Sequence, residues 1–411
     1  MTTTPKTFYL LTGDIGGTNS RMSLYDVRKE EPLVVKYFRN AEHLPDSTHG
    51  DDKAFEKFIV IPFLKHCWAS CNKLVPLEDC DIIGCLATAG LVTANGVRMT
   101  NLGNMLVDGN ALAANTTDPY LKRVKVCRLI NDFVAQGYGC LTLKASEVEH
   151  LHGPKTWVGA EGPKICVGAG TGLGECYLTP TNNSGEYGCF PSEGGHVEYA
   201  PRNDLEVELF QFLSHKFESK HRISVERVVS GKGLANVYEF LAQKFPDRVD
   251  PKMHADFLQA GDEQGRVVAE QAHADANSLG CQALQIMMNA YGCEVGSAAI
   301  KFIPTGGLFV TGGLTPKNMQ FIRGDTSDFM TSYLHKGRVS PLLEKVPLFA
   351  VKVEDLGVRG AKKAAMMEYE RYVQKGEGSM GSAAPSWALP VLTAVAGVAL
   401  GIMVEKRGAR W

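Results

Sequence analysis

Short apolar runs that end in glycine or in a polar pair recur along the chain and predict buried strands. The segments CDIIGCLATAG, from Cys80, and VKVCRLIND, from Val124, have this pattern, which is typical of parallel strands covered on both faces. Elsewhere the apolar residues have a helical period. After Asp204, an expected N-cap, they fall at positions 205, 209, 212 and 213. The two patterns together predict an α/β protein.

The second half of the chain is predicted to be mostly helical before it returns to a strand. Helical patterns extend over SVERVVSGKGLANVYEFLAQKF, over Asp262 to Tyr291, and over Val358 to Val373. A strand and a glycine-rich turn, KFIPTGGLFVTGGLTPK, stand before the last of these helices. We therefore expect helices to surround a strand layer in this half.

Two segments share one pattern and predict an internal duplication. LLTGDIGGTNSRMSLYD, from Leu10, and KICVGAGTGLGECYLTP, from Lys164, each contain an apolar strand, a Gly/Thr-rich turn and a strand with alternating side chains. We divide the chain into a small α/β lobe, residues 1–135, and a large α/β lobe, residues 136–375. The last helix of the large lobe, about 358–373, could pack back on the small lobe.

The C-terminal end differs from the rest of the chain. Residues 376–386, GEGSMGSAAPS, have a flexible-linker composition. Residues 387–404 are 18 residues without a charge, followed by a basic end, and this is just long enough to cross a bilayer as a helix. The alternative is an apolar helix packed on the body or on a partner. We expect a C-terminal apolar helix that anchors a cytoplasmic protein to the cytosolic face of an organelle membrane.

Composition excludes some classes of protein. The chain is 44% hydrophobic with a net charge of −2, which gives no electrostatic reason to expect nucleic-acid binding. Eleven cysteines without CxxC pairs indicate reduced thiols. Cys67 and Cys71 have no further ligands at zinc-site spacing, so buried thiols are expected there. The N-terminus lacks a basic region followed by an apolar run, so we expect no signal peptide.

The turn GDIGGTN indicates phosphate binding without being a P-loop or a dinucleotide fingerprint. In a hairpin, Gly16 and Gly17 would expose backbone N–H groups to an anion, and Thr18 and Asn19 would add donors. A carboxylate at Asp14 would repel phosphate, so we interpret it as a Mg²⁺ partner, acting through water. The alternative is a plain hairpin with a glycine bulge.

Two later glycine-rich turns extend this hypothesis to a nucleotide. GAGTGLG, Gly168 to Gly174, repeats the pattern without the carboxylate, and its Thr171 and glycines can surround phosphate oxygens. In VTGGLTPK, Gly312 and Gly313 would let a flat base lie against bare backbone.

A set of polar residues predicts a polyhydroxylated substrate. LINDFVAQG places Asn131 and Asp132 at the end of a buried strand, where a carboxylate can accept a proton from an attacking alcohol. The alternative role for Asp132 is a helix N-cap. PSEGGHVEYAP adds Glu193 and His196, and VERVVSG adds Glu226. Such acceptors and donors can pair with vicinal hydroxyl groups.

With these motifs, the chain resembles the bacterial-type glucokinases, within the sugar kinase/actin/Hsp70 superfamily, over about residues 8–370. GDIGGTNSR and GAGTGLG look like the family's two phosphate motifs, and VTGGLTP looks like its adenosine motif. Thr100-Asn101, INDF, EGGH and ERVVSG look like its sugar-binding stretches. The resemblance implies two actin-like, RNase H-like lobes around an active-site cleft, and phosphorylation of D-glucose by Mg·ATP.

The resemblance also implies roles for individual residues. Asp132 would be the general base and would contact the sugar. The other sugar-binding residues would be Asn101, Asn131, Glu193, His196 and Glu226. Nucleotide contacts would come from Asp14, Gly16, Gly17, Thr18, Asn19, Gly170, Thr171, Gly172, Gly312 and Gly313, with ATP and Mg²⁺ as cofactors. A homodimer is expected.

Two features of the sequence differ from a related group of proteins, the repressor/kinase group. The repressor/kinase group has a cysteine-rich zinc motif after its Gly-Gly-His, whereas VEYAPRNDLEVE follows His196 here. Those repressors also begin with a helix-turn-helix, and only a short segment precedes the first strand here. Three alternatives stay open: a kinase for another hexose or an amino sugar, a catalytically silent sugar sensor attached to a membrane, and, less favoured, an acyl-phosphate kinase.

Overall fold

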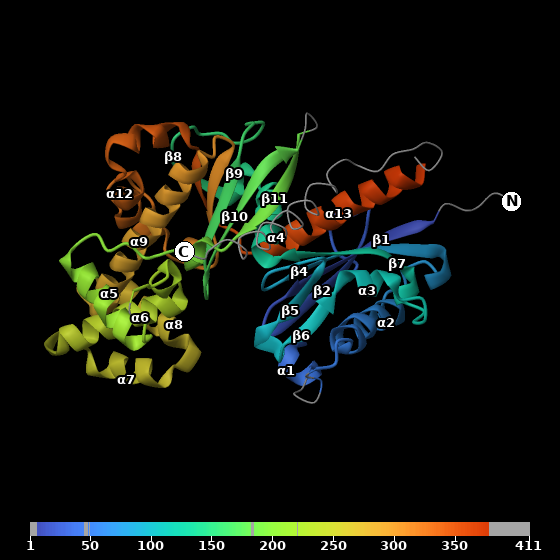
Figure 1. The fold of residues 1–411 in the computed structure, drawn as a ribbon, viewed down its shortest axis with the longest axis horizontal. Helices are drawn as coiled ribbons and strands as arrows, with labels where there is room; N and C mark the ends of the chain where they lie inside the picture. Colours follow the sequence, from blue (N-terminus) through green and yellow to red (C-terminus); the bar gives the residue numbers. More distant parts are fainter. Residues whose placement is uncertain (1–5, 45–47, 49, 182–184, 220, 378–411) are drawn as a thin grey trace, which may run out of the picture. The chain divides into compact units, whose positions relative to one another are not determined.

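The computed structural model describes residues 6–44, 48, 50–181, 185–219 and 221–377. Two β-sheets organise the fold (Figure 1). The first has the order β3-β2-β1-β4-β7 and the second the order β11-β10-β9-β12-β13-β8, with a separate pair β5-β6. The strands are β1 (Thr7–Ile15), β2 (Asn19–Asp26), β3 (Val34–Arg39), β4 (Cys80–Thr88), β5 (Gly96–Met99), β6 (Met105–Asp108), β7 (Val124–Asn131), β8 (Val148–His152), β9 (Lys164–Ala169), β10 (Leu173–Thr181), β11 (Glu186–Ser192), β12 (Gly307–Thr311) and β13 (Leu348–Val351).

The two sheets repeat one topology. In the first sheet β1, β2 and β3 are antiparallel neighbours, and β4 and β7 join in parallel on the side of β1. In the second sheet β9, β10 and β11 are antiparallel neighbours, and β12 and β13 join in parallel on the side of β9. The internal duplication predicted from the segments at Leu10 and Lys164 is confirmed in this strand order. The second sheet adds β8, which pairs antiparallel with β13.

Each sheet has a hydrophobic core of its own. One core joins β1, β2 and β4 to α2 through fully buried residues such as Leu11, Ile82 and Phe63. The other joins β9 and β12 to α6 and α9, with Val167 and Tyr238 completely buried. Burial of both faces of β4 explains why its sequence is a continuous apolar run.

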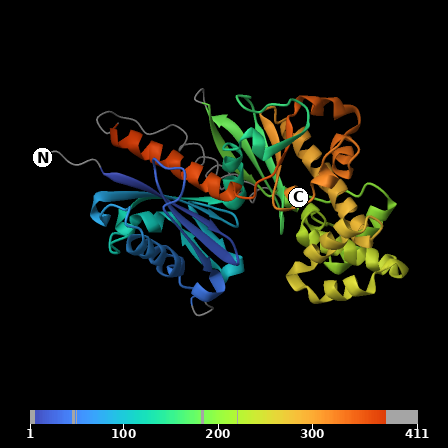
Figure 2. The ribbon, with the colours of Figure 1, turned by 180° about the vertical axis from the view of Figure 1, so that it is seen from behind.

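The helices largely follow the predicted pattern. They are α1 (Asn40–His43), α2 (Ile61–Ser70), α3 (Gly109–Ala114), α4 (Asp132–Cys140), α5 (Asp204–Lys216), α6 (Gly231–Lys244), α7 (Pro251–Gln259), α8 (Gln264–Ala274), α9 (Leu279–Phe302), α10 (Leu314–Lys317), α11 (Met319–Ile322), α12 (Asp328–Leu334) and α13 (Leu356–Glu377). Figure 2 shows the same elements from behind.

The helix predicted from Ser224 begins only at Gly231, after its N-cap Ser230, and the predicted segment starts with a separate 3-10 turn, Val225–Arg227. Two further helix predictions were wrong in detail. The N-cap of α5 is Asn203, whose side chain accepts from the Glu206 N–H, and Asp204 is the first helical residue. The stretch from Asp262 to Tyr291 is not one helix, because Ser278 begins a new helix by accepting from the Cys281 N–H at 3.0 Å. A polar residue that can cap a helix interrupts the apolar pattern at both positions.

Helices α4 and α13 are in backbone contact. A Cβ atom on Gly360 would lie 1.6 Å from the carbonyl oxygen of Ala135, and one on Gly139 would lie 2.2 Å from the carbonyl oxygen of Leu356. Only glycine leaves room for such a close approach of two backbones. This contact fixes α4, whose first residue is Asp132.

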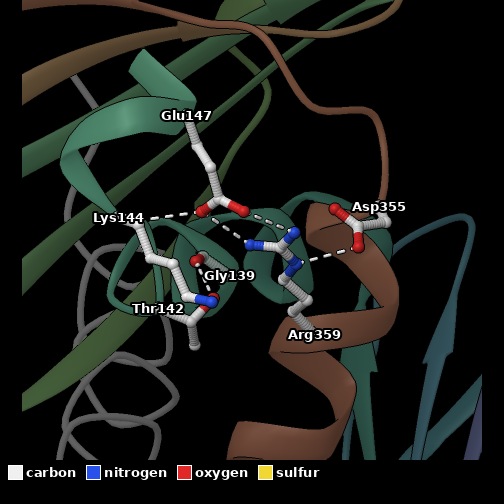
Figure 3. Close-up of polar contacts among 6 residues, drawn as sticks. All are labelled: Gly139, Thr142, Lys144, Glu147, Asp355 and Arg359. Atoms are coloured by element: carbon white, nitrogen blue, oxygen red, sulfur yellow. Dashed lines mark hydrogen bonds and ion pairs between the residues drawn. The ribbon is translucent and has the colours of Figure 1, made fainter. Parts of the chain in front are cut away.

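A charged cluster holds the start of α13 (Figure 3). The Arg359 guanidinium donates to both carboxylate oxygens of Glu147, at 2.8 and 2.9 Å, and to Asp355 Oδ2 at 2.8 Å. Farther along the helix, Lys362 pairs with Glu30 at 2.7 Å, and Glu368 pairs with Arg128 of β7 at 2.9 Å. The helix is therefore bound both to the first sheet and to the turn that precedes β8.

All eleven cysteines are free, as the sequence predicted. Burial raises the pKa of Cys67 to about 12, so its thiol stays protonated and weakly reactive at neutral pH. Cys71 lies one turn later, at the C-terminal end of α2, where its N–H donates to the Cys67 carbonyl at 3.0 Å.

The predicted linker and tail anchor are not covered by these elements. Residues 378–386 and 387–404 lie outside the described residues. Within the described part of the chain, no helix has both the length and the apolar character needed to span a bilayer.

Candidate active site

Ten of the predicted site residues line one cavity of about 470 Å³. They are Asn131, Asp132, Gly170, Thr171, Gly172, Glu193, His196, Glu226, Gly312 and Gly313. These residues come from five separate segments, so the fold gathers motifs that lie far apart in the sequence. Gly90, Gln136 and Ser192 add to the lining.

Asp132 is the first residue of α4, and Asn131 is its N-cap. The Asn131 Oδ1 atom accepts from the N–H groups of Phe133 and Val134, at 2.9 and 3.3 Å. The alternative prediction of an N-cap role for Asp132 is therefore wrong. In the described part of the chain its carboxylate accepts from the Phe133 N–H at 2.9 Å, and the residue lines the cavity.

The environment of Asp132 suits a general base. Burial raises the pKa of its carboxyl group, and the nearby charges of Asp14 and Glu193 raise it further. The Phe133 N–H opposes this by stabilising the ionised form. A carboxylate with a raised pKa accepts a proton from an alcohol more readily than a fully solvated one.

The first glycine-rich turn has the predicted hairpin form. β1 and β2 pair antiparallel up to Ile15 and Ser20, and the Gly16 N–H donates to the Asn19 carbonyl at 3.0 Å. The completely buried Asn40 donates from Nδ2 to the carbonyl oxygens of Gly16 and Gly17, at 2.8 and 3.2 Å.

This contact with Asn40 sets the direction of the turn's N–H groups. In a trans peptide the C=O and the following N–H point in opposite directions. Because the carbonyls of Gly16 and Gly17 face Asn40, the N–H groups of Gly17 and Thr18 face away from it. Two successive N–H groups that point the same way form a concavity that suits an anion.

Asp14 lies on β1 directly opposite Arg21 of β2. Burial raises the pKa of its carboxyl group, and Arg21 lowers it by a smaller effect. Among the described residues, no side-chain hydrogen bond is made to this carboxylate. An open carboxylate beside a turn whose N–H groups suit an anion is a donor set that fits a hydrated Mg²⁺ ion.

The second glycine-rich turn is braced from two sides. The Leu173 N–H donates to Glu226 Oε2 at 2.9 Å, and the Gly231 N–H donates to the Gly170 carbonyl at 2.8 Å. A Cβ atom on Gly170 would meet nothing within 4 Å, so this residue faces open space. Glu226 was expected to bind sugar, and one of its oxygens is occupied by the turn.

The third turn packs on the second. Gly312 has φ +81°, and a Cβ atom there would lie 2.3 Å from the Ala169 carbonyl oxygen. The glycine predicted from the sequence is therefore needed by the backbone conformation and by the contact. Gly313 is open by comparison, with its nearest neighbour, Glu354 Oε2, 3.6 Å from the Cβ position.

Glu193 and His196 flank a short 3-10 turn, Gly194–His196. Their side chains are 67% and 55% exposed, and His196 Nε2 lies 3.8 Å from Glu193 Oε2. Both side chains are accessible to a ligand in the cavity. Asn101 belongs to another 3-10 turn, Thr100–Leu102, and its side chain lies outside the described residues.

Comparisons with known proteins show the family of the chain. The chain matches the family described as Glucokinase over residues 11–368. A glucokinase from Nostoc sp. (strain PCC 7120) is 33% identical over 368 residues, which cover 87% of this chain and 98% of that protein. A glucokinase from Helicobacter pylori (strain P12) is 30% identical over 358 residues, covering 87% and 95%.

The chain belongs to the glucokinase family.

Solved structures show the same fold. A glucokinase from Balamuthia mandrillaris in complex with glucose has a TM-score of 0.66 at 18% identity, covering 87% of this chain and 94% of that one. A ROK family glucokinase from Streptomyces griseus in complex with glucose and AMPPNP has a TM-score of 0.52 at 18% identity, covering 87% and 99%. The mixed α/β architecture is therefore that of the sugar kinases.

The sequence alone did not identify every residue on which this glucokinase-family site depends. Asn40 holds the first turn from 23 and 24 positions away, and the Phe133 ring fills the space beside Gly174, where a Cβ atom would lie 2.1 Å from Cδ2. Asn40 follows β3 in an ordinary polar context, and no local signal marks it. The five predicted residues of the first turn, Asp14 to Asn19, are not among the residues that line the cavity.

We expect Asn40→Ala to raise the KM for ATP at least about tenfold. The substitution removes the side-chain donor of two partly buried carbonyl groups, which costs about 1–3 kcal/mol and frees the N–H groups that would face phosphate. Steady-state kinetics at varied ATP measure this, with Asn277→Ala as a control at an exposed asparagine on another turn. An unchanged KM for ATP in a folded Asn40→Ala protein would contradict the role of this turn.

Proposed function

We propose that this protein is a glucokinase, which transfers the γ-phosphoryl group of ATP to the 6-hydroxyl of D-glucose. The observation that carries the proposal is the position of Asp132. Its carboxylate lines the same cavity as the second glycine-rich turn and as Glu193 and His196. A base between a phosphate site and a hydroxyl-binding site is the arrangement that phosphoryl transfer to an alcohol requires.

The hexose would be held by the polar groups on the sugar side of the cavity. We assign this role to Glu193 and His196, whose side chains are accessible, and to Asn101 and Asn131. Asn131 also donates to the Gly90 carbonyl at 3.2 Å, so it orders the cavity wall while its Oδ1 caps α4. Glu226 would contact the sugar with the oxygen that the second turn leaves free.

The nucleotide would lie along the three glycine-rich turns. Gly16, Gly17, Thr18 and Asn19 would receive phosphate on the first turn, Gly170, Thr171 and Gly172 on the second, and Gly312 and Gly313 would receive the base. Asp14 fits a Mg²⁺ ion held through water, and the ion, when bound, would neutralise phosphate charge. Metal binding would explain why the Asp14 carboxylate, which by itself repels phosphate, lies beside this turn.

In the chemical step, residues of this chain would accept the proton and hold the phosphoryl group. Asp132 accepts the proton of the sugar hydroxyl as the hydroxyl oxygen attacks the γ-phosphorus, and the bond from the γ-phosphorus to the bridging oxygen breaks to release ADP. The N–H groups of the two phosphate turns hold the transferring group in line. We propose that the two sheets belong to two lobes, 1–135 and 136–375, that close on the substrates and exclude water, so that ATP is not hydrolysed.

A coupled assay of ADP release tests this function. The full-length protein is given Mg·ATP and, in separate reactions, glucose, mannose, fructose and glucosamine. We expect glucose to give the highest kcat/KM. Turnover on another sugar alone would keep the mechanism and change the substrate, whereas bound glucose without turnover on any sugar would identify a silent sensor.

We also propose a homodimer and a tail anchor formed by residues 387–404. An N-terminal fluorescent fusion with and without residues 386–411 tests the anchor, because only the longer protein should localise to a membrane. Diffuse fluorescence from both proteins would eliminate it. Analytical ultracentrifugation of the shorter protein tests the dimer.

A further inference from the structure

Glu175 is a buried carboxyl group that the proposed mechanism does not use. It stands on β10, directly after the second phosphate turn, and it is paired with Val167 of β9 and Ser192 of β11. The residue is only 5% exposed. Side chains at alternate positions share one face of a strand, and Tyr177, two residues later, stacks on Phe302 of α9 at 5.2 Å. Glu175 therefore faces α9 beneath the sheet.

The sugar-binding turn rests on this carboxyl group. A Cβ atom on Gly194 would lie 2.1 Å from Glu175 Oε2, and one on Gly195 would lie 2.0 Å from the Leu173 carbonyl oxygen. The two glycines thus let the turn lie flat on β10, with Glu193 and His196 at its two ends. Glu175 itself is not among the residues that line the cavity, so any effect on substrate must pass through the turn.

The charge on Glu175 has little to stabilise it. Its Oε1 atom is buried without a hydrogen-bond partner among the described residues. Burial and then the charge of Glu294 raise the pKa of Glu175 to about 7, while Lys301 lowers it. Both of these neighbours belong to α9, as does Tyr291, and Cys166 of β9 is the remaining titratable group beside it.

The cost of burying Glu175 beneath the turn depends on whether its carboxyl group is neutral or ionised. A neutral carboxyl group can be buried against Gly194 at a much lower cost than a carboxylate, which lacks donors there and is repelled by Glu294. Lys301 is 53% exposed and 3.8 Å from Glu294, so it screens the pair only partly. Ionisation therefore favours a conformation in which water reaches Glu175, and the turn above it must move to admit water.

We propose that Glu175 is a positioning residue for hexose binding, which supports the turn Ser192–His196 while neutral and displaces it when ionised. This inference rests on the proposed hexose kinase function, because it assigns the turn to sugar binding. The inference predicts that a rise in pH weakens hexose binding but does not slow phosphoryl transfer to the hexose once it is bound.

The test measures KM and kcat for glucose from about pH 6 to about pH 8.5. In the natural protein KM should rise with pH, by up to roughly tenfold for each pH unit above the pKa of Glu175. Glu175→Gln keeps the shape and removes the charge, so its KM should stay flat while kcat matches that of the natural protein. Glu186→Gln, an exposed carboxylate on β11 of the same hairpin, should behave as the natural protein. The three proteins share every other ionisable group of the turn, so the difference between them isolates Glu175.

Two outcomes would overturn the inference. One is a Glu175→Gln protein whose KM depends on pH as the natural protein's does, and the other is an effect on kcat alone. If Glu175→Gln fails to fold, Glu294→Gln should move the rise in KM to lower pH, because it removes the neighbouring negative charge; an unmoved rise would contradict the inference. If none of these proteins phosphorylates glucose, the proposed function is wrong, but the inference about Glu175 can still be tested. The pH dependence of the Kd for glucose is then compared between the same proteins by calorimetry.

Discussion

Replacing Asp132 by Asn should lower kcat for glucose phosphorylation by about 10³-fold, within the range of 10²–10⁴ typical of a positioned general base. An amide of the same shape can still accept the hydrogen bond of the sugar hydroxyl, so KM for glucose should change far less than kcat. The raised pKa of Asp132 also has a consequence for pH. Because the base must be ionised, activity should be lost as the pH falls through a pKa above the ordinary aspartate range.

The chain contains a matched control for this substitution. Asn203 and Asp204 begin α5 as Asn131 and Asp132 begin α4, with an asparagine N-cap followed by an aspartate in the first turn. Asp204→Asn therefore removes the same charge from the same helix position, at an exposed site away from the cavity. It should leave kcat unchanged and reproduce any small loss of helix stability. A loss of kcat below about tenfold in Asp132→Asn would contradict its role as the base.

Replacing Gly360 by Ala should have the largest effect on folding. The added Cβ atom would lie 1.6 Å from the Ala135 carbonyl oxygen, which is part of the α4 backbone and cannot rotate away. Separating α4 from α13 removes the packing of both helices, so we expect the free energy of unfolding to fall by about 3 kcal/mol or more. Chemical denaturation followed by circular dichroism measures this.

Gly357 provides the control on the same helix. A Cβ atom there would have Asp14 Oδ2 as its nearest neighbour at 3.8 Å, which is an ordinary contact. Alanine favours a helix over glycine by up to about 1 kcal/mol, so Gly357→Ala should be neutral or slightly stabilising. If both substitutions change the free energy of unfolding by the same amount, Gly360 is not required for the close contact of α4 with α13.

Local patterns in the sequence predicted much of this fold. Glycine-rich turns flanked by alternating strands predicted the hairpins at Asp14 and at Gly170, and their similarity predicted the repeated strand order. These features depend on residues that are neighbours in the chain. The helix limits were less accurate, because Asn203 and Ser278 could be told from other polar residues only by the hydrogen bonds they make.

Contacts between distant segments could not be predicted in this way. Asn40 acts on Gly16 and Gly17 through its side-chain amide, and Glu175 acts on Gly194 because two strands lie side by side. Neither residue belongs to a motif. Sequence motifs predicted most of the residues that line the cavity. The residues that hold those motifs in place could be identified only from the three-dimensional structure.

Detection of the product by ³¹P NMR tests the central claim most directly. The full-length protein, Mg·ATP and glucose are mixed, and Asp132→Asn is run beside them. The account predicts a phosphomonoester signal coupled to the C6 protons of glucose, growing as the γ-phosphate signal of ATP declines, and almost none with the variant. Release of inorganic phosphate alone, or an equal rate of sugar phosphate formation by Asp132→Asn, would contradict it.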